Sequence, residues 1–326
     1  MIEGKVLEDV RGFFKSRVIL TAAELDLFTR LERGQAAADD LAKELRCDQR
    51  SLTRLLDCLV ALKLLSKQDS VYQTSERGVL LSAEHPETEL PMVLHMSGLW
   101  ETWSGLTETL QTGENPRRKP VARRGQDSLK DFIGAMHVVG RSLSNEIADS
   151  YDLSPFNRLL DIGGATGTYT IAFLEKNPEM TAVLFDLPDV IPWAEERLGS
   201  EGLLGRVEFV AGDFYHDELP KGCDLALLSA IIHQNSPQEN LNLYRKIHRA
   251  LMPHGKLLIR DHVMDPARTF PTQGTLFAIN MLVNTKGGDT YTFDEIEDAL
   301  KNVGFAQVEL VRKGERMDCL VEATKL

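Results

Sequence analysis

The stretch RLLDIGGATGTYTIAF occupies residues 158–173. It runs from an apolar, strand-like segment through Gly163, Gly164 and Gly167 into a helix-like segment. In an open parallel sheet, ligands bind beyond the carboxyl ends of the strands, and glycines after the first strand let a ligand approach the backbone closely. The stretch therefore predicts the first strand and the ligand-binding turn of an α/β domain.

Short β-rich runs alternate with helix-like segments after this turn, which predicts a parallel sheet with crossover helices. The runs are RLLDI (158–162), TAVLF (181–185), RVEFV (206–210), DLALLS (224–229) and KLLIRDH (256–262). Two capping boxes, Ser236 to Glu239 and Thr292 to Glu295, predict helix starts. The first capping box places His233 in a strand-to-helix loop. The runs AQVELVR (306–312) and CLVEATK (319–325) predict a closing hairpin.

The first 85 residues predict a winged helix, with helix, short helix, helix and hairpin in that order. The third helix begins at a cap, Asp48, and carries an apolar stripe. Acidic and basic residues nearly balance here, whereas a groove-reading helix needs a basic face, so pairing with a second subunit is favoured over DNA binding. We expect a dimerisation domain over 1–100, a helical connecting region over 101–157 and a catalytic domain over 158–326.

Composition narrows the function further. The chain has 326 residues and a formal net charge of -12, which disfavours nucleic acid and anionic membranes as partners. No apolar run approaches the roughly 20 residues of a membrane helix, and the charged N-terminus is unlike a signal peptide, so we expect a cytoplasmic protein. The four cysteines are scattered without metal-ligand spacing, so no metal is predicted. The loop 114–126 holds five basic residues and is either a solvated connection or an anion-binding segment.

The strand ends indicate what the glycine turn binds. The third glycine, Gly167, comes one position too early for the G-x-G-x-x-G fingerprint, which disfavours a pyrophosphate. Asp186 ends the second strand and suits ribose hydroxyls. Asp213 and Phe214 follow the third strand, where a carboxylate can accept from an adenine amino group and a ring can pack on the base. Together these features predict an adenosine-containing ligand.

Six motifs in order, LLDIGGATG, FDLPDVI, VEFVAGDFY, the IIH loop, MLVNTKGG and NVGF, give the chain a family resemblance. It resembles the dimeric S-adenosylmethionine-dependent O-methyltransferases of the caffeic acid and acetylserotonin type, with their bacterial relatives. The resemblance implies a Rossmann-like class I methyltransferase domain behind an N-terminal winged-helix dimerisation domain. It also implies S-adenosylmethionine as cofactor, S-adenosylhomocysteine as product, and a small aromatic or polycyclic acceptor with a hydroxyl group.

The resemblance also assigns roles to residues. Gly163, Asp186, Asp213 and Phe214 match cofactor-contacting positions, and His233 matches the base that deprotonates the acceptor. Asp261 and Asp289 stand where the family carries two glutamates beside the histidine, and His137, Asn280 and Met281 match segments that border the acceptor pocket. The chain departs from the family in two places. The family's His-Asp-Trp reads His233-Gln234-Asn235, and a lysine often found four residues before the histidine is Ser229.

Histidine suits the chemistry because neutral imidazole accepts a proton near neutral pH, and a carboxylate such as Asp261 on its other nitrogen fixes the tautomer. Three alternatives remain open from the sequence. One is methylation at carbon, or a relative that keeps the cofactor for another reaction. Another is a winged-helix regulator that senses a metabolite. The third is a nicotinamide oxidoreductase, against which the glycine spacing argues.

Overall fold

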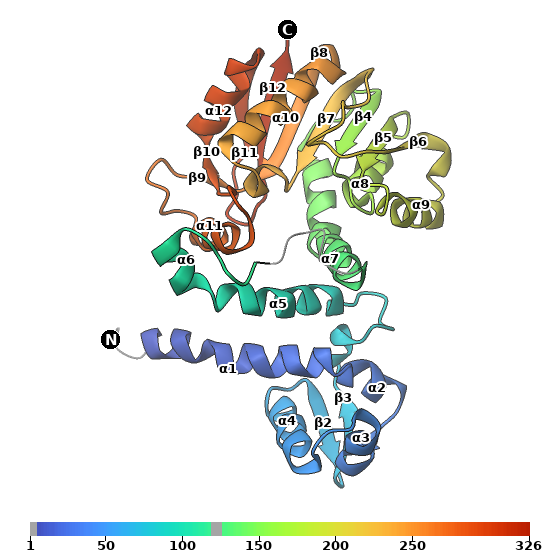
Figure 1. The fold of residues 1–326 in the computed structure, drawn as a ribbon. Helices are drawn as coiled ribbons and strands as arrows, with labels where there is room; N and C mark the ends of the chain where they lie inside the picture. The colour runs from blue at the N-terminus through green and yellow to red at the C-terminus, as the bar shows by residue number, and fades with distance from the viewer. Residues whose placement is uncertain (1–4, 119–125) are drawn as a thin grey trace. The chain divides into compact units, whose positions relative to one another are not determined.

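Two compact units make up the computed structural model, which describes residues 5–118 and 126–326 (Figure 1). The first unit holds the described residues of Met1–Trp100 and Pro120–Val138, and the second those of Glu101–Lys119 and Val139–Leu326. Helices α5 (Leu90–Trp103) and α7 (Gln126–Ser150) each contribute to both units. Seven residues of the basic loop, 119–125, lie outside the described residues.

The first unit is a winged helix. Its three-stranded sheet has the order β1-β3-β2, with β3 antiparallel to both neighbours. The elements are α1 (Lys5–Glu24), α2 (Leu27–Arg33), β1 (Ala36–Ala37), α3 (Ala38–Leu45), α4 (Gln49–Ala61), β2 (Leu65–Gln68), β3 (Val71–Thr74) and the 3₁₀ turn η1 (Gly78–Leu81).

Local chemistry explains the winged helix. The Asp48 carboxylate accepts from the Ser51 backbone N–H, 2.8 Å away, so the predicted cap begins α4. Leu52, Leu56 and Leu59 of α4 are buried at helical spacing against the other helices. The β2–β3 hairpin turns through Asp69 and Ser70, both with positive φ, which is the backbone conformation that matches the twist of paired strands.

The second unit is built on a seven-stranded sheet of order β11-β12-β8-β7-β4-β5-β6. Strands β4 to β8 are parallel, and the β11–β12 hairpin adds two antiparallel strands at one edge. The strands are β4 (Arg158–Ile162), β5 (Thr181–Asp186), β6 (Val207–Ala211), β7 (Cys223–Ser229), β8 (Leu251–Asp261), β11 (Phe305–Arg312) and β12 (Cys319–Lys325). Every predicted run coincides with one of them.

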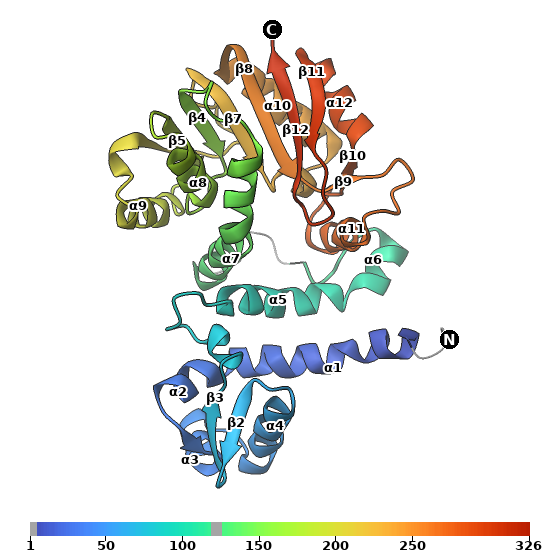
Figure 2. The ribbon, with the colours of Figure 1, turned by 180° about the vertical axis from the view of Figure 1, so that it is seen from behind.

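Helices cover both faces of this sheet (Figures 1 and 2). Side chains of α10 (Pro237–Ala250) and α12 (Phe293–Asn302) fill the core on one face. Those of α8 (Thr168–Lys176), α9 (Ile191–Ser200) and the second half of α7 fill the core on the other. Both predicted capping boxes are present, at the starts of α10 and α12. The remaining elements are α6 (Leu106–Thr112), η3 (Leu204–Arg206), η4 (Ile232–Gln234), β9 (Val263–Met264), α11 (Thr272–Asn284) and β10 (Tyr291–Thr292).

The sheet order fixes where a ligand binds. From β4 the chain proceeds to β5 and β6 on one side, and then crosses to β7 and β8 on the other. The crevice at such a reversal, outside the carboxyl ends of the strands, is the usual ligand site of an open α/β sheet. None of the helices in the described part of the chain is long and apolar enough to cross a bilayer.

Candidate active site

The glycine turn after β4 brings three strand ends together. Gly163 has φ +70°, and its N–H donates to the Phe185 carbonyl of β5 over 2.8 Å. A Cβ atom at this position would lie 3.0 Å from Ile231, which follows β7, and 3.5 Å from Phe214, which follows β6. A glycine is needed here because φ is positive and because a Cβ atom would come too close to Ile231. The turn therefore forms a cradle beside the Phe214 ring.

Asp186 anchors the turn from the end of β5. Its carboxylate accepts from the Ala165 N–H over 2.8 Å and from the Leu187 N–H over 2.7 Å. Burial raises the pKa of Asp186, and these two hydrogen bonds act in the opposite direction. The carboxylate is thus fixed next to the glycine turn, where it fits the predicted contact with ribose hydroxyls.

The loop after β6 holds Asp213 and Phe214. One Asp213 oxygen accepts from the Tyr215 N–H, and the other lies 2.8 Å from the His216 ring, so its predicted contact with adenine stays a prediction. Lys246 of α10 fixes the loop, because its ammonium group donates to the carbonyls of Phe214, Tyr215 and Asp217 over 2.8–3.0 Å.

The structure joins His233 and Asp261 directly. His233 lies in the turn η4 between β7 and α10, and Asp261 is the last residue of β8. The His233 Nδ1 atom is 3.0 and 2.9 Å from the two carboxylate oxygens. Burial disfavours the charged form of Asp261, but His233 and Arg260 outweigh it, and the pKa of Asp261 is lowered. Nδ1 therefore carries the proton, and Nε2 presents a lone pair.

Asp289 contacts the catalytic loop through its backbone and not through its carboxylate. Its backbone N–H donates to the His233 carbonyl over 2.9 Å, whereas its carboxylate pairs with Arg268 at 3.0 Å. The backbone of Asp289 thus holds the loop in place. The catalytic role that the resemblance gives to its carboxylate stays a prediction.

Helix α11 supplies an aromatic wall beside the histidine. The Phe277 ring meets the His233 ring edge-on at 4.8 Å and also contacts His262 at 5.2 Å. Met281 follows one turn later on the same side of the helix and is buried. Asn280 accepts from the Trp103 indole N–H over 2.9 Å. His137 is half-buried and lies in the part of α7 that belongs to the first unit.

Asn235, where the resembled family carries tryptophan, is fully buried and hydrogen-bonded on both sides of its amide. Its oxygen accepts from the Tyr215 hydroxyl over 2.5 Å, and its nitrogen donates to Asn240 over 2.9 Å. Asn240 in turn donates to the Ile232 carbonyl, next to His233. The chain of hydrogen bonds links the loop after β6 to the catalytic turn. In the sequence, only the departure from the family at position 235 points to this connection.

Two further residues near the glycine turn were not predicted from the sequence. Asp161 is buried below the turn, where it accepts from the Thr170 hydroxyl over 2.6 Å, and burial raises its pKa to about 6. Tyr169, in the first turn of α8, is also buried, and its ring lies 5.0 Å from the Arg260 guanidinium carbon.

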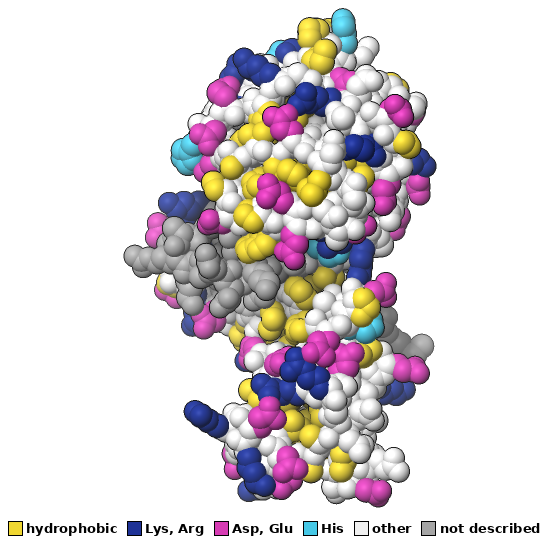
Figure 3. All heavy atoms as spheres, turned by 90° about the vertical axis from the view of Figure 1, so that its right-hand side faces the viewer, with side chains coloured by type: hydrophobic (Ala, Val, Ile, Leu, Met, Phe, Trp, Pro, Cys, Tyr) yellow, Lys and Arg dark blue, Asp and Glu magenta, His cyan; other side chains and the backbone are white. Residues whose placement is uncertain are grey.

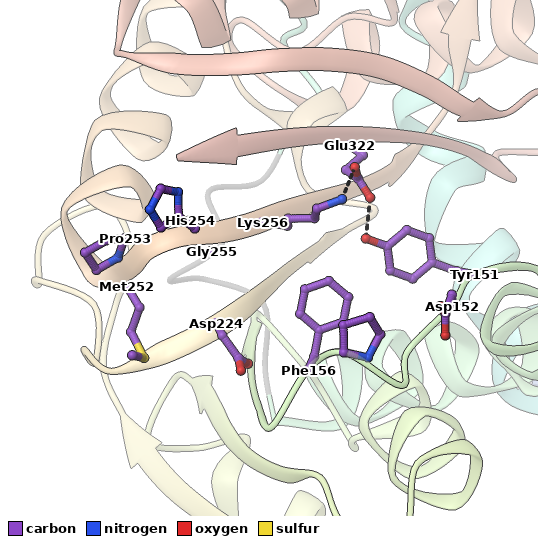
Figure 4. A pocket seen from close by; sticks show the side chains of 11 residues that line it. Tyr151, Asp152, Phe156, Asp224, Met252, Pro253, His254, Gly255, Lys256 and Glu322 are labelled. Carbon is purple, nitrogen blue, oxygen red and sulfur yellow. Dashed lines mark hydrogen bonds and ion pairs between the residues drawn. The ribbon is translucent and has the colours of Figure 1, made fainter. Parts of the chain in front are cut away.

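A cavity of 440 Å³ lies elsewhere, at the opposite end of the sheet (Figure 4). Its lining includes Asp224 and Met252, near the amino ends of β7 and β8. Glu322 accepts from both Lys256 and Tyr151 there, and with Lys256 it forms an ion pair. We place the chemistry at the carboxyl ends of the strands, where the histidine and the glycine cradle converge, and not in this cavity.

Fold and site together define a class I methyltransferase that uses S-adenosylmethionine. A family model of the O-methyltransferase domain matches residues 121–306, and one of the O-methyltransferase dimerisation domain matches residues 7–84. The chain belongs to the dimeric S-adenosylmethionine-dependent O-methyltransferases, as the sequence motifs indicated.

Individual relatives agree with this membership. The chain is 30% identical to the tetracenomycin polyketide synthesis 8-O-methyl transferase TcmO of Streptomyces glaucescens, over 94% of this chain and 92% of that protein. It is also 30% identical to the 3-hydroxy-5-methyl-1-naphthoate 3-O-methyltransferase of Streptomyces sahachiroi, over 92% and 89%. The crystal structure of human N-acetylserotonin methyltransferase in complex with SAM shares the fold, with a TM-score of 0.84, 24% identity, and coverage of 100% and 98%.

Proposed function

We propose that the enzyme methylates a phenolic hydroxyl on a polycyclic aromatic acceptor, with His233 as the general base. The observation that carries this proposal is the His233–Asp261 pair, which engages Nδ1 and leaves Nε2 as the proton acceptor, with the Phe277 ring perpendicular to the His233 ring at 4.8 Å. The relatives named for tetracenomycin and naphthoate substrates support an aromatic acceptor of this size.

The chain's own residues account for the steps. Asp186, Phe214 and the glycine turn would hold the adenosine part of the cofactor, which supplies a methyl group on a positively charged sulfur when bound. His233 Nε2 takes the proton from the acceptor hydroxyl, and Asp261 stabilises the imidazolium that results. The cofactor would supply the methyl group for the new carbon–oxygen bond and would leave as S-adenosylhomocysteine. Fixed placement of the acceptor oxygen contributes to the rate as well.

The proposal includes a homodimer formed through the first unit. Helix α1 exposes a set of apolar side chains, of which Phe13 is 51% and Phe14 60% exposed. Contiguous apolar surface of this kind marks an interaction site. The dimerisation-domain match covers most of this helix. On the face drawn in Figure 3, acidic and basic side chains are interspersed, which does not favour a phosphate backbone as the partner.

Transfer from methyl-labelled S-adenosylmethionine to a panel of hydroxylated naphthoates and larger polycyclic phenols tests the proposal. We expect labelled methyl ether products, identified by NMR of the methyl carbon. The matched control is each acceptor with its hydroxyl already methylated, which we expect to receive no label. Label on a ring carbon would replace the O-methyl assignment with carbon methylation, and a cofactor that binds without transfer to any phenol would contradict the acceptor class.

A further inference from the structure

Arg268 lies in the segment between β9 and α11 and attaches it to the start of α12. One terminal nitrogen donates to the Asp289 carboxylate over 3.0 Å and to the Thr290 carbonyl over 2.9 Å. The other terminal nitrogen donates to both oxygens of Glu295, over 2.5 and 2.7 Å. Glu295 is the acidic residue of the capping box that begins α12. The backbone of Arg268 has φ +59°, a conformation that a non-glycine residue keeps only where contacts hold it.

This attachment differs from an ordinary surface ion pair. The side chains are partly exposed, 38% for Arg268 and 44% for each of Asp289 and Glu295, and a single pair of such exposure contributes little to stability. The guanidinium, however, binds two carboxylates and a backbone carbonyl at once. A lysine cannot reproduce this arrangement, because its ammonium group is a compact point charge without the planar set of donors. We therefore expect the network to fix a position more than to raise the free energy of unfolding.

The contacts of Arg268 form a closed ring that includes the catalytic histidine. Asp289, whose carboxylate binds the guanidinium, donates its backbone N–H to the His233 carbonyl over 2.9 Å. In the other direction the chain runs from Arg268 into α11, whose Phe277 ring lies 4.8 Å from the His233 ring at an interplanar angle of 88°. His233 is thus contacted at its backbone by one end of this ring of contacts and at its imidazole by the other.

The segment before α11 is internally hydrogen-bonded, so a displacement at Arg268 would be passed on to the helix. The Asp265 carboxylate accepts from two backbone N–H groups at the end of the segment, over 2.7 and 2.8 Å, and the Asp265 N–H donates to the Phe270 carbonyl over 2.8 Å. Helix α11 also packs closely on β9, because a Cβ atom at Gly274 would lie 2.4 Å from the Met264 sulfur. Loss of the Arg268 contacts should therefore leave the helix folded and change its placement.

We propose that Arg268 is a positioning residue, which sets the place of the Phe277 ring against the imidazole of His233. This inference rests on the proposed function. Asp261 holds the imidazole at Nδ1, and the Phe277 ring limits how far the imidazole can turn about that hydrogen bond, so Nε2 keeps its direction toward the acceptor oxygen. Small misplacements of a catalytic group slow a reaction strongly. Asp289 then acts through Arg268 and not as a carboxylate that contacts the histidine.

Histidine NMR measures this placement without any substrate. In protein labelled with carbon-13 at the histidine ε1 position, the Phe277 ring current shifts the His233 signal, which His233→Ala identifies by its absence. We expect the signal in Arg268→Met to move toward its position in Phe277→Leu. The matched control is Arg249→Met, which should leave the signal unmoved. Arg249 also contacts both oxygens of a carboxylate, that of Glu218, but lies in the last turn of α10, directly before the start of β8.

Methyl transfer to the phenolic acceptor measures the consequence for the reaction. We expect Arg268→Met to lower kcat on the order of tenfold and to leave the affinity for S-adenosylhomocysteine within about twofold of wild type. Arg268→Lys should recover only part of the rate, because the planar donors are missing. In the Phe277→Leu background, Arg268→Met should cause no further loss, because the ring that it positions is absent.

An unmoved His233 signal in Arg268→Met would overturn the inference, whatever the activity. Equal losses of kcat with and without the Phe277 ring would also overturn it, since Arg268 would then be a general structural contact. In Asp289→Asn, a shift of the acid limb of the rate profile to lower pH by about one unit would show that this carboxylate acts on the histidine directly, against the inference. A His233 signal that moves as expected in an enzyme that methylates no phenol would overturn the proposed function and leave the placement by Arg268 standing.

Discussion

Asp161 lies directly below the glycine turn, and a Cβ atom at Gly164 would come within 2.9 Å of its carboxyl carbon. Burial raises its pKa from an ordinary value near 4 to about 6. Between pH 4 and pH 6, Asp161 is therefore protonated in the native state and ionised in the unfolded state. The contribution of Asp161 to the free energy of unfolding is therefore present below pH 4 and is lost as the pH rises through 6.

We expect the Asp161→Asn variant to lose this dependence. The difference in unfolding free energy between variant and wild type should change by about 2–3 kcal/mol between pH 4 and pH 7, with the variant relatively more stable at pH 7. Urea unfolding at several pH values measures it. The control is Asp149→Asn, a carboxylate on the surface. A constant difference for Asp161→Asn across this range would show that folding does not raise the pKa of Asp161.

Helix α10 holds both loops of the site in place. Lys246 fixes the loop after β6, and Asn240 fixes the turn that carries His233. Asn235 joins the two loops, because it bonds to Tyr215 on one side and Asn240 on the other. Where the family has a tryptophan, this chain has a hydrogen-bonded connection between cofactor loop and catalytic turn.

We expect Asn235→Ala to lower kcat on the order of 10- to 100-fold, because the catalytic turn loses its fixed position. Tyr215→Phe removes only the hydroxyl and should have a smaller effect. If the two residues act through one bond, the double variant should be about as slow as Asn235→Ala alone. Steady-state kinetics of the four proteins measure this coupling. If the losses in kcat of the two single variants multiply in the double variant, the two loops are not linked through Asn235.

Local signals explain which elements the sequence predicted. Strand ends, the Asp48 cap and the capping boxes at Ser236 and Thr292 depend on neighbours within a few residues, and all are present in the structure. The partners of Asn235 come from the loop after β6 and from α10, so no spacing rule reveals them. Phe277 was missed for the same reason, because an apolar residue in a helix indicates packing unless its contact with His233 is known.

The exposed apolar side of α1 explains why the enzyme should work as a dimer. We expect replacement of both Phe13 and Phe14 by aspartate to give monomers, since a buried apolar interface would then contain unpaired charges. Light scattering at micromolar concentration measures the mass. The control is Leu204→Asp, a similarly exposed leucine on the second unit, which should leave the dimer intact. A wild type that is monomeric at this concentration would contradict the account.

Methyl transfer within a single turnover, with labelled cofactor and saturating phenolic acceptor, tests the role of His233 most directly. We expect His233→Ala to bind S-adenosylhomocysteine with near-wild-type affinity, because the cofactor contacts come from other strand ends. Its transfer rate should fall about 10²- to 10⁴-fold, the usual contribution of a positioned base. The wild-type rate should fall on acidification, since protonated imidazole cannot accept the hydroxyl proton, and the variant should lose this dependence. Near-normal transfer by His233→Ala, with cofactor bound, would contradict His233 as the base.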